Sequence, residues 1–279
     1  MFRPILATTD LVNPSSLALQ AAYHWSQTLG TTCTLVHVDT LVDPPRKTLE
    51  DYVKDCHVPL DQVTLQRLEG DVADVLTQYA KTHNIGAIFL EGKKQSRLES
   101  FIMGSVAEEL LQMSPVPLVF PRTPEVFNCK HIGVGCDFSE TNGKVLEVVT
   151  ELAKGLGAEV TLVHVIATNS REYSDQSFLL DDFHNQNLNN LIQSQEQVAF
   201  KRLKELSEKV KEAGVTCHVQ VKLTFNSDIA EVFIEMTKAH QWHLLALGPH
   251  SRSWLDGWPL GSVTTSLVHE GQVSLMVVR

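Results

Sequence analysis

The chain has 279 residues, enough for two domains of ordinary size, and its 43% hydrophobic and 20% charged residues are typical of a globular protein. Its formal net charge of −10 argues against a general DNA- or RNA-binding surface, which needs clustered Lys and Arg. The five cysteines include no Cys-x-x-Cys pair, which argues against a disulfide framework or a thiolate zinc site and favours a reducing compartment. No signal-like stretch opens the chain and no apolar run is long enough to span a bilayer, so we expect a cytoplasmic protein without a membrane span.

The sequence repeats itself at a shift of 127 residues, which relates Asp10 to Asp137. At the same shift the pentapeptide Thr-Leu-Val-His-Val at 34–38 recurs without change at 161–165. An identity of this length, in register with the residues around it, indicates an internal repeat rather than chance.

A later block repeats at a shift of 157 residues, where Gly104-Ser-Val corresponds to Gly261-Ser-Val. The second copy therefore carries about 30 extra residues between the two blocks. We expect the two copies at residues 1–122 and 129–279. The prolines at the joint, residues 121–124, favour an extended linker.

Each copy predicts strands that alternate with helices. The first copy predicts strands at 4–8, 32–38, 63–68, 87–90 and 116–120, and helices at 15–29, 49–55 and 72–83 and after Gly104. The second copy predicts strands at 131–135, 159–166, 216–223, 244–247 and 274–278, and helices at 141–156, 188–210 and 229–240 and after Gly261. This alternation predicts a five-stranded parallel sheet in each copy, covered by helices on both faces, with ligands beyond the carboxyl ends of the strands.

The stretch 243–263 predicts a buried strand, a polar loop and the start of a helix. The N–H groups of a first helical turn favour a bound anion, and glycine lets the backbone come close to a phosphate. Ser262 can add a hydroxyl donor. The same pattern also fits an ordinary strand–loop–helix connection in which Ser262 caps the helix.

The repeat and this loop resemble the universal stress protein family in its tandem form, over nearly the whole sequence. Nucleotide-binding members of that family carry Gly-x-x-Gly, nine residues and then Gly-Ser or Gly-Thr, with an Asp after the first strand. The second copy has Gly248, two residues, Ser251, nine residues and then Gly261-Ser262. It departs from the family pattern at Ser251, whose Cβ hinders a close approach of backbone to phosphate.

The resemblance implies two Rossmann-like (adenine nucleotide alpha hydrolase-like) domains that pack as a pseudo-dimer through their last strands, and a homodimer of such chains. It implies a stress-response protein that binds ATP, ADP or AMP, with or without Mg²⁺, as a regulatory switch in the second domain. Asp137 would lie near the ribose or base, and the Val165 backbone near the base. By resemblance, the nucleotide-binding residues are Asp137, Val165, Gly248, Ser251, Gly261, Ser262 and Val263.

The first copy departs further from the family pattern. Glu91 and Lys94 stand where the two glycines belong, although Gly104-Ser105 remain. A carboxylate at a phosphate site is repulsive unless Lys93 or Lys94 neutralises it. We therefore expect the first copy to hold a degenerate, mainly structural site.

Several residues allow a simpler interpretation. Asp137 fits a ligand contact or an Asx-turn after a strand. His37 and His164 are expected to be buried and hydrogen bonded rather than catalytic, since no nucleophile is near. Four further histidines form no metal-ligand spacing, so we expect solvated or capping roles for His240, His243, His250 and His269. The polar loop within 243–263 also holds Trp254 and Trp258, which fit packing or a lid over the pocket. Asp256 lies between them and fits a metal contact.

Two other functions stay open. One is a scaffold that binds a partner protein or an apolar ligand and no nucleotide, which the substitutions at Glu91, Lys94 and Ser251 favour. The other is a slow Mg²⁺-dependent ATP hydrolase, with Asp137 or Asp256 on the metal. No residue is placed by the sequence as a general base for water, so we assign no catalytic and no metal-binding residue.

Overall fold

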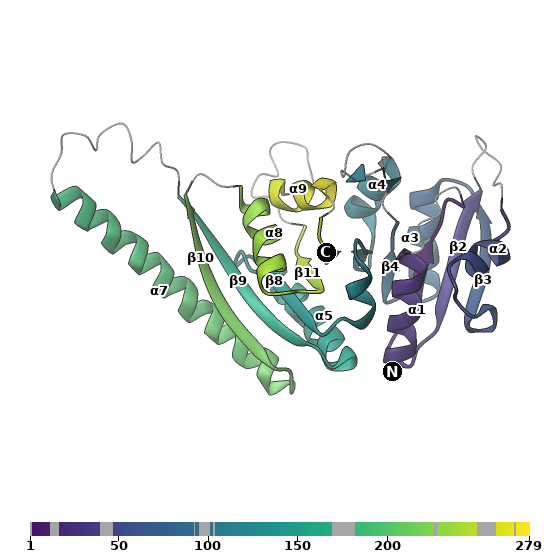
Figure 1. The fold of residues 1–279 in the computed structure, drawn as a ribbon, viewed down its shortest axis with the longest axis horizontal. Helices are drawn as coiled ribbons and strands as arrows, with labels where there is room; N and C mark the ends of the chain where they lie inside the picture. The colour runs from purple at the N-terminus through teal and green to yellow at the C-terminus, as the bar shows by residue number, and fades with distance from the viewer. Residues whose placement is uncertain are drawn as a thin grey trace.

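The computed structural model describes residues 2–11, 17–39, 47–91, 93–94, 101–102, 104–168, 182–225, 228–249, 261–270 and 272–279. Ten strands in these ranges form one sheet (Figure 1). The strands of the first half are β1 Ile5–Thr8, β2 Cys33–Asp39, β3 Val63–Glu69, β4 Ala87–Phe89 and β7 Leu118–Phe120. Those of the second half are β8 His131–Gly135, β9 Glu159–Thr168, β10 Cys217–Phe225, β11 Leu244–Leu247 and β12 Leu275–Val277. A separate hairpin of β5 Lys93–Lys94 and β6 Phe101–Ile102 follows β4.

The two halves have the same strand order, running outward from their junction. The sheet order is β10-β9-β8-β11-β12-β7-β4-β1-β2-β3, and neighbouring strands within each half are parallel. The halves join where β7 and β12 pair antiparallel, with Leu118 opposite Val277 and Phe120 opposite Leu275. The predicted α/β class, with two copies paired through their last strands, is confirmed.

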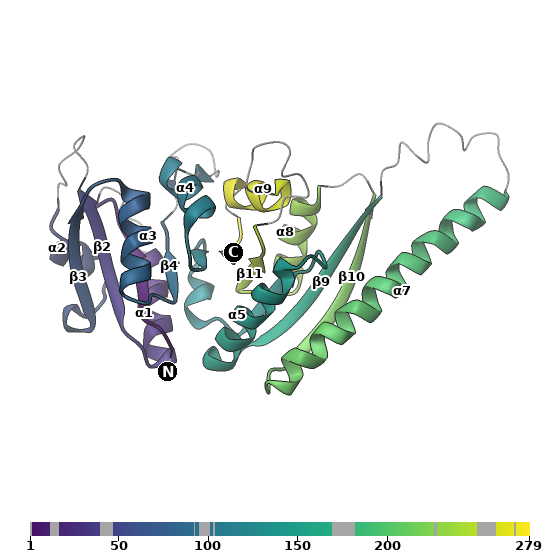
Figure 2. The same cartoon turned by 180° about the vertical axis from the view of Figure 1, so that it is seen from behind.

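Helices cover both faces of the sheet (Figures 1 and 2). They are α1 Leu17–Leu29, α2 Leu49–Asp55, α3 Val72–Thr82, α4 Ser105–Met113, α5 Thr141–Leu156, α7 Asp182–Glu212, α8 Ile229–Ala239 and α9 Ser262–Glu270. Buried side chains of α1, α2, α5 and α7 share one apolar cluster, and those of α3, α4, α8 and α9 share the other. The strands contribute side chains to both clusters, because successive residues of a strand point to opposite faces of the sheet. In β1, Ile5 and Ala7 belong to the first cluster and Leu6 to the second.

The joint between the halves differs from the expected extended linker. Residues Pro124–Asn128 form a 3₁₀ helix with proline at its start, where the missing N–H costs nothing. Val126 is fully buried, and its carbonyl accepts a hydrogen bond of 2.7 Å from the indole Nε1 of Trp25 on α1. Thr123, which precedes Pro124, is extended as the proline favours, and the buried Val126 fixes the following helix against the first half.

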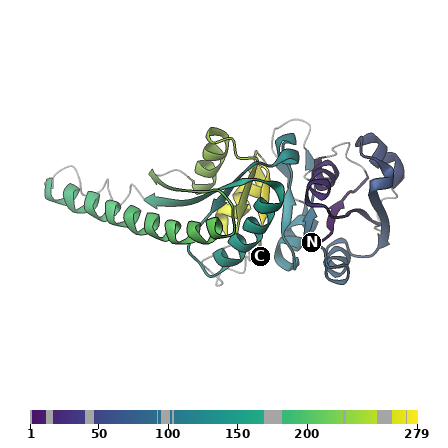
Figure 3. The same ribbon diagram turned by 90° about the horizontal axis from the view of Figure 1, so that it is seen from below.

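Helix α7 is longer than the predicted 188–210. It packs against β9 and β10 through a buried row of Ala199, Leu203 and Val210, while its N-terminal half extends past the sheet (Figures 1 and 3). Across the described ranges, no helix is both long and apolar enough to cross a membrane.

A glycine in β8 makes a packing prediction. A Cβ at Gly133 would lie 2.6 Å from Cδ2 of the buried Trp242 ring and closer still to Cε3. We expect Gly133→Ala to lower the free energy of unfolding by about 2 kcal/mol through overpacking, measured by urea unfolding. Gly143→Ala on α5 is the control, since no atom lies within 4 Å of its Cβ and alanine favours helix. Equal losses at both positions would contradict this packing.

Candidate functional site

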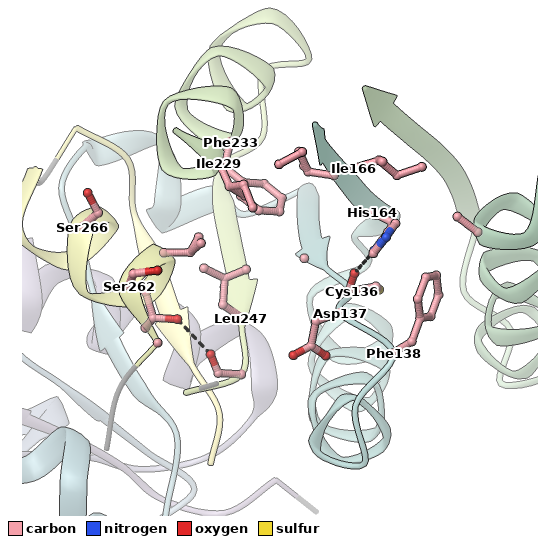
Figure 4. A pocket seen from close by; sticks show the side chains of 18 of the residues that line it. Cys136, Asp137, Phe138, His164, Ile166, Ile229, Phe233, Leu247, Ser262 and Ser266 are labelled. Carbon is pink, nitrogen blue, oxygen red and sulfur yellow. Dashed lines mark hydrogen bonds between the residues drawn. The ribbon is translucent and has the colours of Figure 1, made fainter. Parts of the chain in front are cut away.

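A cavity of about 1480 Å³ opens at the carboxyl edge of the second half. It lies between the ends of β8, β9 and β11, the first turn of α9, and residues of α7 and α8 (Figure 4). The structure brings six of the seven sequence-predicted residues to its lining, namely Asp137, Val165, Gly248, Gly261, Ser262 and Val263. The seventh, Ser251, lies outside the described residues, as do His250, Trp254, Asp256 and Trp258.

The first turn of α9 faces this cavity. The Gly261 carbonyl accepts the first helical hydrogen bond, 3.0 Å from Thr265 N, while its own N–H donates to Pro249 O. The N–H groups of residues 262–264 therefore have no acceptor within the helix. Thr264 Oγ1 donates to the Gly248 carbonyl at 3.0 Å and so ties this turn to the end of β11. Such a helix start favours an anion.

Asp137 lies across the cavity from Ser262 (Figure 4). Its Oδ1 accepts hydrogen bonds from Ser139 N at 3.0 Å and from Ser139 Oγ at 2.7 Å, which is an Asx-turn. Its own N–H donates to Asn142 Oδ1 at 3.0 Å. The two sequence interpretations of Asp137 are therefore compatible, because the turn that orders the loop also holds the carboxylate at the cavity.

Phe138 is a site residue that the sequence did not reveal. Its φ is +59°, a left-handed conformation that costs a bulky residue on the order of 1–3 kcal/mol unless the surroundings hold it. Its ring centre lies 4.5 Å from that of His164, and the Arg202 guanidinium lies 5.4 Å from it. Leu11, at the same place in the first half, has φ +58°. No residue-type signal marks either position.

His164 and His37 make the same backbone contact in the two halves, as expected of hydrogen-bonded histidines. Nδ1 of His164 lies 2.6 Å from Cys136 O, and Nδ1 of His37 lies 2.9 Å from Thr9 O (Figure 4 shows the former). A carbonyl only accepts, so Nδ1 carries the proton in both rings. The contact fixes the ring orientation next to the first loop of each half.

One wall of the cavity comes from α7, through Ser194, Gln195, Val198, Ala199 and Arg202. The sequence did not predict this wall, since these residues lie far along the chain from the loop motifs. The inner surface is apolar around Ile166, Phe233 and Leu247. With anion-binding N–H groups at α9, a carboxylate at Asp137 and an apolar floor, the cavity suits a ligand that has an anionic end and a flat apolar body.

The model of the universal stress protein family matches residues 46–121 and 128–279. The chain belongs to this family. It is 26% identical over 226 residues to Universal stress protein MT2052 of Mycobacterium tuberculosis and, equally, to Universal stress protein Mb2019 of Mycobacterium bovis. These matches cover 78% of the chain and 66%, just under two thirds, of each relative.

Solved structures share the fold over the whole chain. A universal stress protein from Archaeoglobus fulgidus has a TM-score of 0.64 at 16% identity, over 99% of this chain and 98% of that one. A putative universal stress protein from Pseudomonas aeruginosa has a TM-score of 0.67 at 14% identity, over 99% and 93% of the two chains. The tandem form of the universal stress protein fold is thus shown.

The first half of this universal stress protein differs at the place that corresponds to the cavity. Glu91, at the position of Gly248, accepts a hydrogen bond of 3.0 Å from the hydroxyl of Tyr52 on α2. Tyr52 is 3% exposed, and burial, followed by the charge of Glu91, raises the pKa of its hydroxyl. The short helix α2 therefore supplies a hydrogen-bond donor for this carboxylate. The side chains of Lys93 and Lys94, which the sequence predicts to neutralise it, lie outside the described part of the structure.

This buried contact predicts a stability effect. We expect Tyr52→Phe to lower the free energy of unfolding by about 2 kcal/mol, because it removes the hydroxyl group that donates to the Glu91 carboxylate. Tyr23→Phe is the matched control, since Tyr23 donates an exposed hydrogen bond to Gln62 Oε1 at 2.8 Å. Urea unfolding of both variants measures the difference. Similar small losses in both would show that the Tyr52–Glu91 bond contributes little.

His243 has a capping role at the start of β8. Its Nδ1 accepts hydrogen bonds from the backbone N–H groups of Lys130, at 3.2 Å, and His131, at 3.1 Å. Burial and then the nearby His131 lower the pKa of His243, and Glu125 opposes this shift. In the part of the chain that the structure describes, no group of three or more His, Cys, Asp or Glu side chains is arranged to hold a metal ion.

The depressed pKa of His243 predicts a loss of stability in acid. The imidazole of His243 binds a proton more readily in the unfolded state than in the folded state. The stabilisation is therefore complete above the pKa of the unfolded chain, 6.5, and is lost as the pH falls below it. We expect the melting temperature of the wild type to fall between about pH 7 and pH 5.5. The melting temperature of His243→Asn should fall less over this range, since the Asn amide oxygen accepts the same hydrogen bonds without titrating. Parallel melting curves of wild type and variant across this range would contradict the assignment.

Proposed function

We propose that the second half binds an adenine nucleotide and that the bound state acts as a switch in a stress response. The observation that carries this proposal is the α9 start, whose N–H groups at residues 262–264 face the same cavity as Asp137 and Val165. Membership of the universal stress protein family supports the choice of an adenine nucleotide among possible anions.

In this proposal the phosphates bind at the first turn of α9, with Ser262 Oγ as an additional donor. The ribose lies near Asp137, whose carboxylate can accept from a sugar hydroxyl. The base lies near the backbone of Val165, against the apolar floor. The protein has a net charge of −10, so the N–H groups at the start of α9 must supply the local attraction for the phosphates.

A switch fits the site better than rapid turnover. Asp137 Oδ1 already accepts two hydrogen bonds from Ser139, and the proton of His164 is held by Cys136 O. These contacts order the loop beside the cavity, and the sequence places no general base to activate water. We therefore propose that the nucleotide changes the population of a conformer or an assembly.

The expected location is the cytoplasm. All five cysteines are buried free thiols, which suits a reducing compartment. We also propose that two chains pair as a homodimer.

The nucleotide site can be tested by calorimetric titration of ATP and AMP, with Mg²⁺, into the full chain. We expect one site of about micromolar affinity, near −8 kcal/mol, and at least a tenfold loss in Gly261→Val, whose side chain enters the first turn of α9. Gly104→Val is the matched control, since Gly104 holds the same place before α4 and its Cβ would meet no atom within 4 Å. We expect it to bind like wild type.

Two outcomes would overturn this proposal. No heat and no thermal shift with either nucleotide would favour a scaffold that binds a partner protein or an apolar ligand. Equal losses in Gly261→Val and Gly104→Val would remove the second half as the specific site. Metal-dependent release of phosphate that Asp137→Asn abolishes would instead favour the hydrolase.

A further inference from the structure

The cavity of the second half is larger than a pocket for one small ligand usually is. Such pockets measure about 300–1,000 Å³, whereas this cavity measures about 1480 Å³. It extends from the first turn of α9 to α7, and Figure 4 shows Ser262 at one end and Phe138 and His164 at the other. The nucleotide proposed above occupies the α9 end and the middle, next to Asp137 and Val165. The α7 end is therefore available to a second ligand.

The α7 end of the cavity combines an apolar wall with one cation. Ala167, Val198 and Ala199 line it, and Val198 is 54% exposed although it belongs to the wall. Among the described lining residues, Arg202 is the one Lys or Arg and Asp137 is the one Asp or Glu. Arg202 makes no ion pair with any residue that the structure describes. A cation beside an apolar wall suits an anion that has an apolar body.

Phe138 positions Arg202 at this end of the cavity. The guanidinium carbon lies 5.4 Å from the centre of the Phe138 ring, and this ring lies 4.5 Å from that of His164. Nδ1 of His164 donates to Cys136 O at 2.6 Å, so the stack rests on the residue that follows β8. A guanidinium stacked on a ring keeps the N–H groups of its edge available. These groups match the two oxygens of a carboxylate.

The first half supplies a carboxylate of its own at the corresponding end of its second strand. Asp39, at the position of Ile166, accepts a hydrogen bond of 2.8 Å from Arg67 Nη2. By the register of the strands, Val221 takes the place of Arg67 in the second half. Both partners of that ion pair are thus apolar in the second half, where the cation at the cavity comes from α7 instead. A carboxylate for Arg202 would therefore come from a ligand.

We propose that the α7 end of the cavity binds a small monocarboxylic acid with an apolar body. The carboxylate pairs with the guanidinium of Arg202, and the apolar body packs on Val198 and Ala199. Asp137 repels a second carboxylate, so the acid group lies toward α7 and away from the middle of the cavity. This site adds to the proposed nucleotide site and does not depend on it, so it is tested without a nucleotide.

Calorimetric titration of octanoate into the nucleotide-free full chain tests this site. We expect one octanoate per chain, with a dissociation constant below about 1 mM. Arg202→Gln should weaken binding by about fivefold or more, since glutamine keeps a polar side chain but removes the charge. Lys204→Gln is the matched control, because Lys204 also lies over a phenylalanine ring, that of Phe200 at 5.0 Å, but is not among the lining residues. We expect it to bind octanoate like wild type.

Octanamide separates the charge of the acid from its apolar contacts, because it has the same shape and is neutral. We expect octanamide to bind wild type about as weakly as octanoate binds Arg202→Gln. The substitution should leave octanamide binding unchanged, so that the cycle of two ligands and two proteins isolates the ion pair. Equal losses of octanoate and octanamide in Arg202→Gln would overturn the pairing of the carboxylate with Arg202.

The apolar wall gives a second, independent test. Val198→Asp places a carboxylate where the body of the acid packs, and we expect it to abolish octanoate binding. Gln197→Asp adds the same charge one residue earlier, outside the lining, and is expected to bind octanoate like wild type. No octanoate binding by wild type, or equal behaviour within either pair of variants, would overturn the proposal. These results do not depend on whether the α9 end binds a nucleotide.

Discussion

The antiparallel pairing of β7 with β12 is the constraint on which the rest of the structure depends. Each strand would otherwise be an exposed apolar edge, since Leu118, Phe120, Leu275 and Val277 are all buried. Pairing them satisfies both edges with backbone hydrogen bonds and joins two five-stranded sheets into one. The two clusters of apolar side chains then run through both halves, so apolar packing is continuous across the junction.

The junction also supports the candidate site. Arg122 follows β7, and its backbone N–H donates to Ser274 Oγ at 3.0 Å, while its Nη2 donates to Val268 O, near the C-terminal end of α9, at 3.1 Å. Burial lowers the pKa of Arg122 to about 10, which still leaves it charged at neutral pH. A cation suits the negative end of the helix dipole, as a phosphate suits the other end. The first half therefore holds the helix whose N-terminus faces the cavity of the second.

Sequence patterns predicted those elements that local chemistry decides. The helix expected at 49–55 is α2, and the strand expected at 244–247 is β11. The internal repeat predicted that Asp137 and Gly248 would lie at one edge of the sheet, since both follow parallel strands. Helix α7 begins six residues before its predicted start at 188, because Asn and Gln there give no apolar periodicity to detect.

The remaining features depend on contacts between distant parts of the chain. The positive φ of Phe138 leaves no mark on residue type, and the partnership of Tyr52 with Glu91 joins residues 39 positions apart. The 3₁₀ helix of the joint is held by packing on α1, where Val126 O accepts from Trp25 Nε1 and Phe127 stacks on His24. Sequence reasoning missed these because packing, not propensity, selects them.

The two halves have diverged in what they do with the same edge of the sheet. In the first half, a carboxylate stands at the glycine position and accepts a hydrogen bond from a tyrosine of a short helix. In the second half, Gly248 stands at that position, and the longer α7 supplies a wall of the cavity. The loop after the first strand keeps the same turn in both halves, with φ +58° at Leu11 and +59° at Phe138. The divergence therefore lies in what the surrounding helices add to a conserved backbone turn, a tyrosine from α2 in one half and a cavity wall from α7 in the other.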